Sequence, residues 1–317
     1  MTSNAKIVVT SRTFCQVPSL CEELIETFPN TTLNTSGAFF QRLDLIEFLK
    51  EADGILLGTE AMDREVIDAL PKVKIISKYG VGLDNIDLDY AKQAGKIIGS
   101  TGGVNRRSVA EQTLSFMIGM CRNLFWTGYQ MKNGNWDKNG GFQLSGKKVG
   151  IIGCGYVGAD LLKLLQPFEC QLMICDILDK HDIAKKFDAK QVDHDVIFED
   201  SDIITMHVPL TDLTYNMVSG KTLNMMKNTA YLINTSRGKV VDQQALKIAL
   251  LKQTIAGAAI DVYADEPPTD MEFLSLPNLW PTPHIGGNAI EAVKAMGQSA
   301  ISHLKTFFCK YKKNHDK

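Results

Sequence analysis

A glycine pattern of six residues constrains the fold of this chain more than any other feature. Residues 153–158 read Gly-Cys-Gly-Tyr-Val-Gly, a complete G-x-G-x-x-G, and they follow the predicted strand Val149–Ile152 and open a predicted helix. In such a unit Gly153 permits a tight turn, Gly155 lets the backbone approach a pyrophosphate, and Gly158 lets the helix pack closely on the strand. This context predicts a dinucleotide-binding unit.

An acidic residue ends the next predicted strand at the position that this unit requires. The strand Leu172–Cys175 is followed by Asp176, 18 residues after Gly158. A carboxylate there can accept hydrogen bonds from both ribose hydroxyls of an adenosine, and it would repel a 2′-phosphate. The alternative is a glycine-rich turn with an ordinary acid at a strand end. We expect NAD, rather than NADP, as the cofactor.

Strand-like and helix-like segments alternate along most of the chain, which is typical of parallel β-α-β units. The expected strands are Ile7–Thr10, Gly54–Leu57, Ile75–Ser77, Ile97–Gly99, Val149–Ile152, Leu172–Cys175, Ile203–Met206, Tyr231–Asn234 and Ala256–Asp261. The expected helices are Pro18–Phe28, Leu43–Leu49, Asp63–Leu70, Leu88–Ala94, Ser108–Arg122, Val157–Leu165, Asp242–Leu251 and Ala289–Phe308. The predicted fold class is α/β, with two domains on parallel sheets, and the second series begins near residue 148 or slightly earlier.

An aromatic segment between the two series has neither a helical nor a strand period. Within residues 125–142 it contains Phe125, Trp126, Tyr129, Trp136 and Phe142 amid glycine and asparagine. We expect an arm or a linker here, whose rings cover either a partner subunit or their own domain.

Charge and hydropathy exclude several classes of protein. The formal charge of −2 provides no basic field for nucleic acid, and no apolar run reaches the roughly 20 residues that span a bilayer. The N-terminus has no basic stretch followed by a long apolar one, so no secretory leader is predicted. The seven cysteines fit neither a zinc pattern nor a disulfide framework. We expect a cytoplasmic protein with reduced thiols and no metal, nucleic acid or membrane as a partner.

Titratable side chains follow predicted strands in the second half of the chain. Arg237 comes shortly after one strand, and Asp261 ends the next, with Glu266 behind it. His284 lies in a loop between two prolines and two glycines. Ligands of parallel α/β sheets bind beyond the carboxyl ends of the strands, and arginine can grip a carboxylate with two parallel hydrogen bonds. The alternatives are a surface arginine, an ordinary loop acid and a structural histidine.

Several motifs carry a resemblance that covers nearly the whole chain. They are the glycine turn and the segments Gly80–Asp87, Ser108–Glu111, Thr235–Gly238, Asp261–Val262, Asp265–Pro267 and Pro283–Gly287. Together they resemble the D-isomer-specific 2-hydroxyacid dehydrogenases, especially the phosphoglycerate dehydrogenase-like branch. The resemblance implies two Rossmann-like domains: a substrate-binding domain at 1–101 plus 288–317, and an NAD-binding domain at 102–287 inserted into it.

By this resemblance the catalytic residues are Arg237, Glu266 and His284. The implied activity is that of an oxidoreductase, which transfers a hydride between NAD(H) and the C2 carbon of a D-2-hydroxy acid or 2-keto acid. His284 would exchange the proton on the C2 oxygen, Glu266 would orient His284, and Arg237 would hold the substrate carboxylate. The pairing of the histidine with a glutamate argues against a formate dehydrogenase, because the related site of that enzyme pairs its histidine with a glutamine.

The resemblance also implies which residues bind the cofactor and the substrate. The implied cofactor contacts are Gly153, Gly155, Tyr156, Val157, Gly158, Asp176, Val208, Pro209, Thr235, Asp261, His284 and Gly286. The implied substrate contacts are Lys78, the backbone at Val81 and Gly82, and Arg237.

Two chemical classes are compatible with the sequence at the distal end of the substrate. Phosphoglycerate dehydrogenases usually place arginines where this chain has Lys78 and Gly58, so one of two phosphate-binding charges is missing and Glu60 lies close by in the sequence. Arg106 or Arg107 could supply a replacement. The substrate is then either phosphorylated, as 3-phosphoglycerate is, or a small acid such as hydroxypyruvate or glyoxylate.

The alternative function is that of a non-catalytic NAD(H)-sensing binding protein, like the corepressors that share this scaffold. Turnover of a 2-keto acid would distinguish the enzyme from the binding protein. The resemblance finally implies a homodimer in which the aromatic segment wraps the partner.

Overall fold

The computed structural model describes residues 3–315, and the chain forms two compact units. The first unit runs to Asn105 and resumes at Asn288, whereas the second is the continuous stretch Arg106–Gly287. The second unit is therefore inserted into the first. The predicted fold class, two α/β units with parallel sheets, is confirmed.

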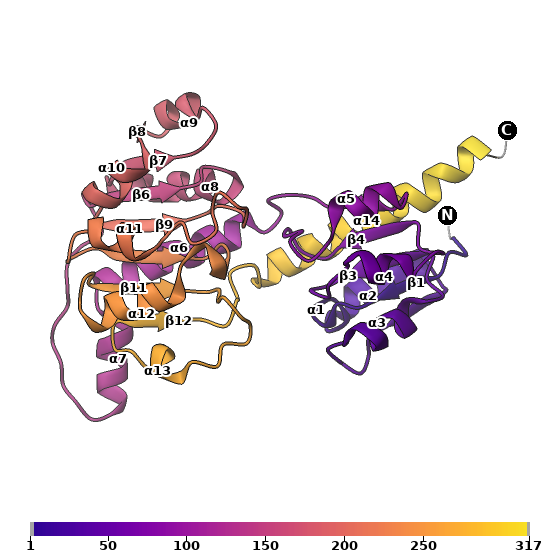
Figure 1. The fold of residues 1–317 in the computed structure, drawn as a ribbon, viewed down its shortest axis with the longest axis horizontal. Helices are drawn as coiled ribbons and strands as arrows, with labels where there is room; N and C mark the ends of the chain where they lie inside the picture. The colour runs from indigo at the N-terminus through magenta and orange to yellow at the C-terminus, as the bar shows by residue number, and fades with distance from the viewer. Residues whose placement is uncertain (1–2, 316–317) are drawn as a thin grey trace. The chain divides into compact units, whose positions relative to one another are not determined.

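The first unit is built on five parallel strands in the order β2-β1-β3-β4-β5. The strands are β1 (Ile7–Val9), β2 (Thr31–Leu33), β3 (Gly54–Leu57), β4 (Ile75–Lys78) and β5 (Ile97–Gly99). The helices are α1 (Arg12–Cys15), α2 (Pro18–Thr27), α3 (Arg42–Leu49), α4 (Arg64–Asp68), α5 (Leu88–Gln93) and the long α14 (Ile290–His315) (Figure 1).

Helices cover both faces of this sheet, which explains why its strands are continuously apolar. Successive residues of β1 point to opposite faces. Ile7 and Val9 pack with residues of α1, α2 and α14, whereas Val8 packs with residues of α3, α4 and α5. All three side chains are at most 1% exposed.

The second unit is built on seven parallel strands in the order β12-β11-β10-β9-β6-β7-β8. The strands are β6 (Lys148–Ile152), β7 (Gln171–Cys175), β8 (Ala189–Gln191), β9 (Ile203–Met206), β10 (Tyr231–Asn234), β11 (Gly257–Ile260) and β12 (Leu279–Pro281). Counted from β6, this is the Rossmann order with one more strand at its edge. The strand order reverses between β6 and β9, where ligands bind in such folds.

Helices also cover both faces of the second sheet (Figure 1). They are α6 (Arg106–Cys121), α7 (Leu124–Lys132), α8 (Tyr156–Leu165), α9 (His181–Lys186), α10 (His194–Asp200), α11 (Gly220–Met225), α12 (Gln243–Leu251) and α13 (Met271–Leu274), with single 3₁₀ turns at Gln166–Phe168 and Gly238–Val240. Ile151 packs with residues of α6 and α8, whereas its neighbour Ile152 packs with residues of α10, α11 and α12.

The aromatic segment differs from the prediction, because Leu124–Lys132 is helical. This helix, α7, buries none of its residues, so its sequence has no apolar stripe with a helical period. Phe125 packs against Trp280 with ring centroids 6.1 Å apart, and so covers its own unit. Tyr129 and Trp136, in contrast, are 61% and 77% exposed.

Cys15, Cys21, Cys121, Cys154, Cys170 and Cys175 are free thiols. Across residues 3–315, no helix has both the length and the apolar character needed to cross a membrane.

Candidate active site

The glycine turn joins β6 to α8 and leaves the backbone accessible to an anion. Gly153 has a φ of 91°, and a Cβ there would lie 2.5 Å from the carbonyl oxygen of His207. A Cβ at Gly158 would collide with the carbonyl of Gly153. Space is open where a Cβ of Gly155 would lie, and α8 begins at the next residue, Tyr156. This turn therefore fits a pyrophosphate at the helix N-terminus.

Asp176 follows β7, and its carboxylate is held against the glycine turn. One oxygen accepts a hydrogen bond from the Cys154 N–H at 2.8 Å, and the other accepts one from the Leu178 N–H at 2.9 Å. The two bonds fix the carboxylate. Each oxygen still has a lone pair with which to accept from a ribose hydroxyl.

Val208 and Pro209 follow β9, the strand that borders β6 on the side opposite β7. A Cβ at Gly153 would lie 2.8 Å from Cγ1 of Val208, so this side chain lies against the glycine turn. Thr235 follows β10, but its buried hydroxyl lies 3.0 Å from Thr113 Oγ1 on α6. The Thr235 side chain thus packs α6 on the sheet, and its contact with the cofactor stays a prediction.

His284 and Glu266 form a hydrogen-bonded pair. His284 Nδ1 lies 2.7 Å from Glu266 Oε2, and the Tyr263 N–H donates to Glu266 Oε1 at 3.1 Å. The hydrogen bond to Glu266 raises the pKa of His284, although burial opposes it. Burial acts to raise the pKa of the Glu266 carboxyl, but the hydrogen bond and charge of His284 outweigh it, and this pKa is lowered. Both shifts favour the charged pair.

Arg237 belongs to the same group. It follows β10, is half-buried, and donates from its guanidinium to the Ser236 carbonyl at 2.7 Å. Its positive charge acts to lower the pKa of both Glu266 and His284. The second unit therefore brings together all three residues that the sequence predicts to be catalytic.

Asp261 is the most completely hydrogen-bonded acid of this group. It is 1% exposed, and it accepts from the N–H groups of Ile285 and Gly286, each at 2.8 Å. Thr282 Oγ1 donates to it at 2.5 Å and Gln112 Nε2 at 2.9 Å. The carboxylate thus holds the loop that carries His284, and its predicted contact with the cofactor remains untested.

Sequence reasoning did not single out Gln112, Thr282 or Asn85 as functional. The sequence contained one signal for Gln112, which follows Ser108 by one helical turn on the side of α6 that faces the sheet. In the structure, Ser108 Oγ donates to the Gly286 carbonyl at 2.6 Å.

The predicted substrate residues Lys78, Val81 and Gly82 belong to the first unit, at the carboxyl end of β4. Lys78 is 6% exposed, and its ammonium donates to the carbonyl oxygen of Gly58 and to Asn85 Oδ1, the latter at 2.9 Å. Val81 and Gly82 follow it in a half-buried loop.

A carboxylate lies on the other side of Gly58. Glu60 Oε2 accepts from Thr10 Oγ1 at 2.6 Å, and Thr10 Oγ1 accepts from the Gly58 N–H at 3.0 Å. Asn85 Nδ2 donates to the Glu60 carbonyl at 2.6 Å. These bonds join the carboxyl ends of β1 and β3 to the loop after β4.

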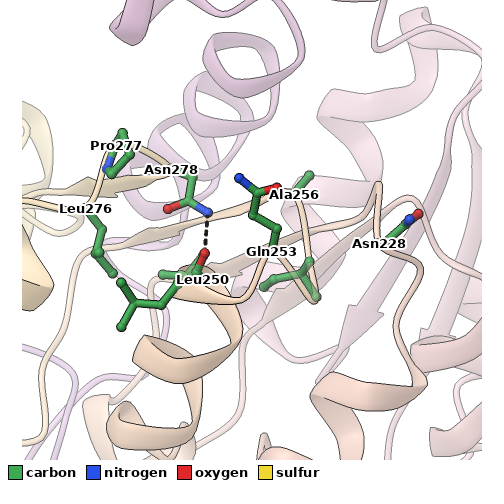
Figure 2. A pocket seen from close by; sticks show the side chains of 9 residues that line it. Asn228, Leu250, Gln253, Ala256, Leu276, Pro277 and Asn278 are labelled. Carbon is green, nitrogen blue, oxygen red and sulfur yellow. Dashed lines mark hydrogen bonds between the residues drawn. The ribbon is translucent and has the colours of Figure 1, made fainter.

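A shallow pocket of about 400 Å³ lies elsewhere in the second unit (Figure 2). Asn228, Ala256 and Asn278 precede β10, β11 and β12, so the pocket lies at the amino ends of these strands. Asn278 Nδ2 donates to the Leu250 carbonyl at 3.1 Å, as Figure 2 shows. Its lining contains amide and apolar side chains and no titratable group, so this pocket offers no acid–base chemistry.

Comparisons with known proteins point to one family. The family model described as "D-isomer specific 2-hydroxyacid dehydrogenase, NAD binding domain" matches residues 114–286, which lie within the second unit. A glyoxylate reductase from Thermococcus litoralis is 34% identical over 302 residues, which cover 92% of this chain and 91% of that protein. A D-3-phosphoglycerate dehydrogenase from Methanocaldococcus jannaschii is 34% identical over 267 residues, 83% of this chain but 51% of that protein.

A solved structure is similar over almost the whole chain. The crystal structure of a glyoxylate reductase from Paecilomyes thermophila has a TM-score of 0.84 and 26% sequence identity. The match covers 97% of this chain and 96% of that one.

Proposed function

The chain belongs to the D-isomer-specific 2-hydroxyacid dehydrogenases, and within this family we propose roles for its residues and a class of substrate. It is an NAD-dependent oxidoreductase that acts on C2 of a 2-hydroxy or 2-keto acid. None of the comparisons favours an NAD(H)-sensing binding protein.

The proposed catalytic residues are His284, Glu266 and Arg237. When bound, NAD(H) supplies or accepts the hydride at C2. His284 donates a proton to the C2 oxygen during reduction and takes it back during oxidation. Glu266 holds Nδ1 of the imidazole and stabilises its protonated form, and Arg237 binds the substrate carboxylate. The contact of 2.7 Å between His284 and Glu266 carries this assignment, because it supplies an oriented acid–base group.

We also propose the cofactor contacts from the geometry of the glycine turn and of Asp176. The open turn at Gly155 would receive the pyrophosphate, and the anchored carboxylate of Asp176 would accept from the ribose. In the first unit, the backbone of Val81 and Gly82 would bind the substrate carboxylate.

We propose a small, unphosphorylated 2-keto acid such as glyoxylate or hydroxypyruvate as the substrate. An arginine at position 58 would require its neighbours to shift, because a Cβ there would lie 3.0 Å from both Glu60 Oε2 and Ser11 Cα. The carboxylate of Glu60 would also repel a phosphate. The ammonium of Lys78 is turned towards the Gly58 carbonyl and Asn85. These observations favour the glyoxylate reductases over the phosphoglycerate dehydrogenase-like branch.

A replacement charge from Arg107 is not supported. Arg107 Nη2 donates to Asp160 Oδ1 at 2.9 Å, and its Nε lies 2.8 Å from Oδ2 of the same carboxylate. A guanidinium paired with both oxygens of an acid is poorly suited to bind a phosphate as well.

Oxidation of NADH, followed with glyoxylate, hydroxypyruvate and 3-phosphohydroxypyruvate, tests the substrate class. We expect kcat/KM for the phosphorylated acid to be lower by about 10-fold or more, since a charge-assisted contact contributes about 1.5–3 kcal/mol. Glu60→Gln should narrow this gap. A preference of about 100-fold for the phosphorylated acid would contradict this proposal and would mean that Lys78, together with Arg106 or Arg107, binds the phosphate.

Two further features stay proposals. The exposed rings of Tyr129 and Trp136 support a homodimer in which the aromatic segment contacts the partner. We also expect the enzyme to be cytoplasmic.

A further inference from the structure

The loop that carries His284 closes around one buried carboxylate. Asp261 Oδ1 accepts from Thr282 Oγ1 at 2.5 Å and from the Ile285 N–H at 2.8 Å, and Oδ2 accepts from the Gly286 N–H at 2.8 Å. Donors thus stand on both sides of His284 in the sequence. The position of His284 therefore depends on the position of the Asp261 carboxylate.

Gln112, on α6, binds both the carboxylate and the loop. Its Nε2 lies 2.9 Å from Asp261 Oδ1 and 2.9 Å from Thr282 Oγ1. Because an ionised carboxylate only accepts hydrogen bonds, the amide nitrogen must face Asp261. Because Asp261 Oδ1 and Thr282 Oγ1 lie only 2.5 Å apart, they share one amide hydrogen of Gln112, and the Thr282 hydroxyl donates to Asp261.

The backbone of His284 needs such support. Its φ is 53°, in the left-handed region that a histidine rarely adopts, and such a conformation persists only when its surroundings hold it. The His284 N–H donates to the Thr282 carbonyl at 3.0 Å, and Tyr263 Oη donates to the same oxygen at 2.9 Å. Thr282 therefore connects the Gln112 amide to the backbone of the histidine.

We propose that Gln112 is a positioning residue for the reaction, which acts through Asp261 and Thr282 to hold the His284 imidazole against Glu266. This inference rests on the proposed role of His284 as the acid–base group. Gln112 itself does not have to touch the substrate or the cofactor.

Gln112→Met is the first test, because it removes both hydrogen bonds and nearly preserves the size of the side chain. We expect kcat to fall by about 10-fold to 100-fold, since small misplacements of a reacting group cost rate, while KM for the keto acid changes by less than about 3-fold. If the substitution only reduced the amount of folded enzyme, the number of active sites would fall, but the pH profile of kcat would not change.

Gln112→Glu is the second test, and it gives a signature that a uniform loss of folded enzyme cannot produce. When protonated, the introduced carboxyl group can donate to Asp261, whereas its ionised form repels that carboxylate. The reductive kcat should therefore fall reversibly with rising pH, through an ionisation that the wild type lacks. The other titratable groups around this network, Asp261, Glu266, His284, Tyr263 and Arg237, are common to both proteins.

Gln166 provides the matched control. It is exposed in the same unit, and its Nε2 donates to the carbonyls of Leu162 at 3.3 Å and Phe187 at 3.0 Å. Gln166→Met and Gln166→Glu should retain the wild-type kcat and pH profile.

The outcomes separate the two proposals. If both Gln112 variants behave like the Gln166 variants while His284→Ala is inactive, the inference about Gln112 is wrong. If His284→Ala itself turns over at the wild-type rate, the proposed function of His284 is wrong. If Gln112→Met does not fold, the pH profile of Gln112→Glu decides alone, since a wild-type profile there overturns the inference.

Discussion

His284 Nδ1 lies 2.7 Å from Glu266 Oε2, so the carboxylate occupies this nitrogen of the imidazole. The hydrogen bond to Glu266 raises the pKa of His284, so the imidazolium persists to higher pH than in a free histidine. An acid of this kind suits the reduction of a keto acid, in which the C2 oxygen takes up a proton.

Glu266→Gln should move the pH profile of reduction. The wild-type kcat/KM for a keto acid is expected to be high at low pH and to fall as pH rises through the raised pKa of His284. Without the carboxylate that pKa drops, so the falling limb should move to lower pH. Initial rates across a pH series measure the shift, and an unmoved limb would contradict the pairing.

His284→Ala should abolish most turnover and leave NADH binding largely intact. A general acid–base group contributes about 10²–10⁴-fold to rate, and the imidazole acts on the substrate proton. Steady-state rates and NADH fluorescence titration measure the two effects. A variant with near wild-type kcat would rule out this role.

Asp176→Ala should narrow the preference for NADH over NADPH. The carboxylate, fixed by the N–H groups of Cys154 and Leu178, would meet a 2′-phosphate with like charge. The ratio of kcat/KM for the two cofactors is the measure, and Asp179→Ala, three residues further along the chain, is the control. A wild type that uses NADPH as efficiently as NADH would contradict this role for Asp176.

Light scattering at micromolar concentration should give the mass of a dimer. Glu substitutions at Tyr129 and Trp136 should shift the protein towards the monomer, because they place charge on exposed rings of the aromatic segment. Ile248→Glu is the control, since Ile248 on α12 is an apolar residue that is 50% exposed. A wild-type monomer would count against the homodimer.

Local patterns in the sequence were sufficient to predict both α/β units, whereas the candidate catalytic residues were named by the family resemblance. Buried parallel strands are continuous apolar runs, and Arg237 comes shortly after the end of such a run, β10. The helix α7 could not be predicted in this way. It buries no residue, and a helix without a buried face has no apolar period to detect.

The sequence by itself determined the glycine turn, the acid at Asp176 and most of the strands, though not β2, β8 and β12, because these features depend on residues close together in the chain. Only the tertiary structure decided the partners of the polar side chains. Gln112 meets Asp261, which is 149 residues away, Thr113 meets Thr235 across 122 residues, and Arg107 pairs with Asp160 across 53. A buried polar group must find a hydrogen-bond partner, and the packing of α6 on the sheet and on α8 sets which one lies within reach.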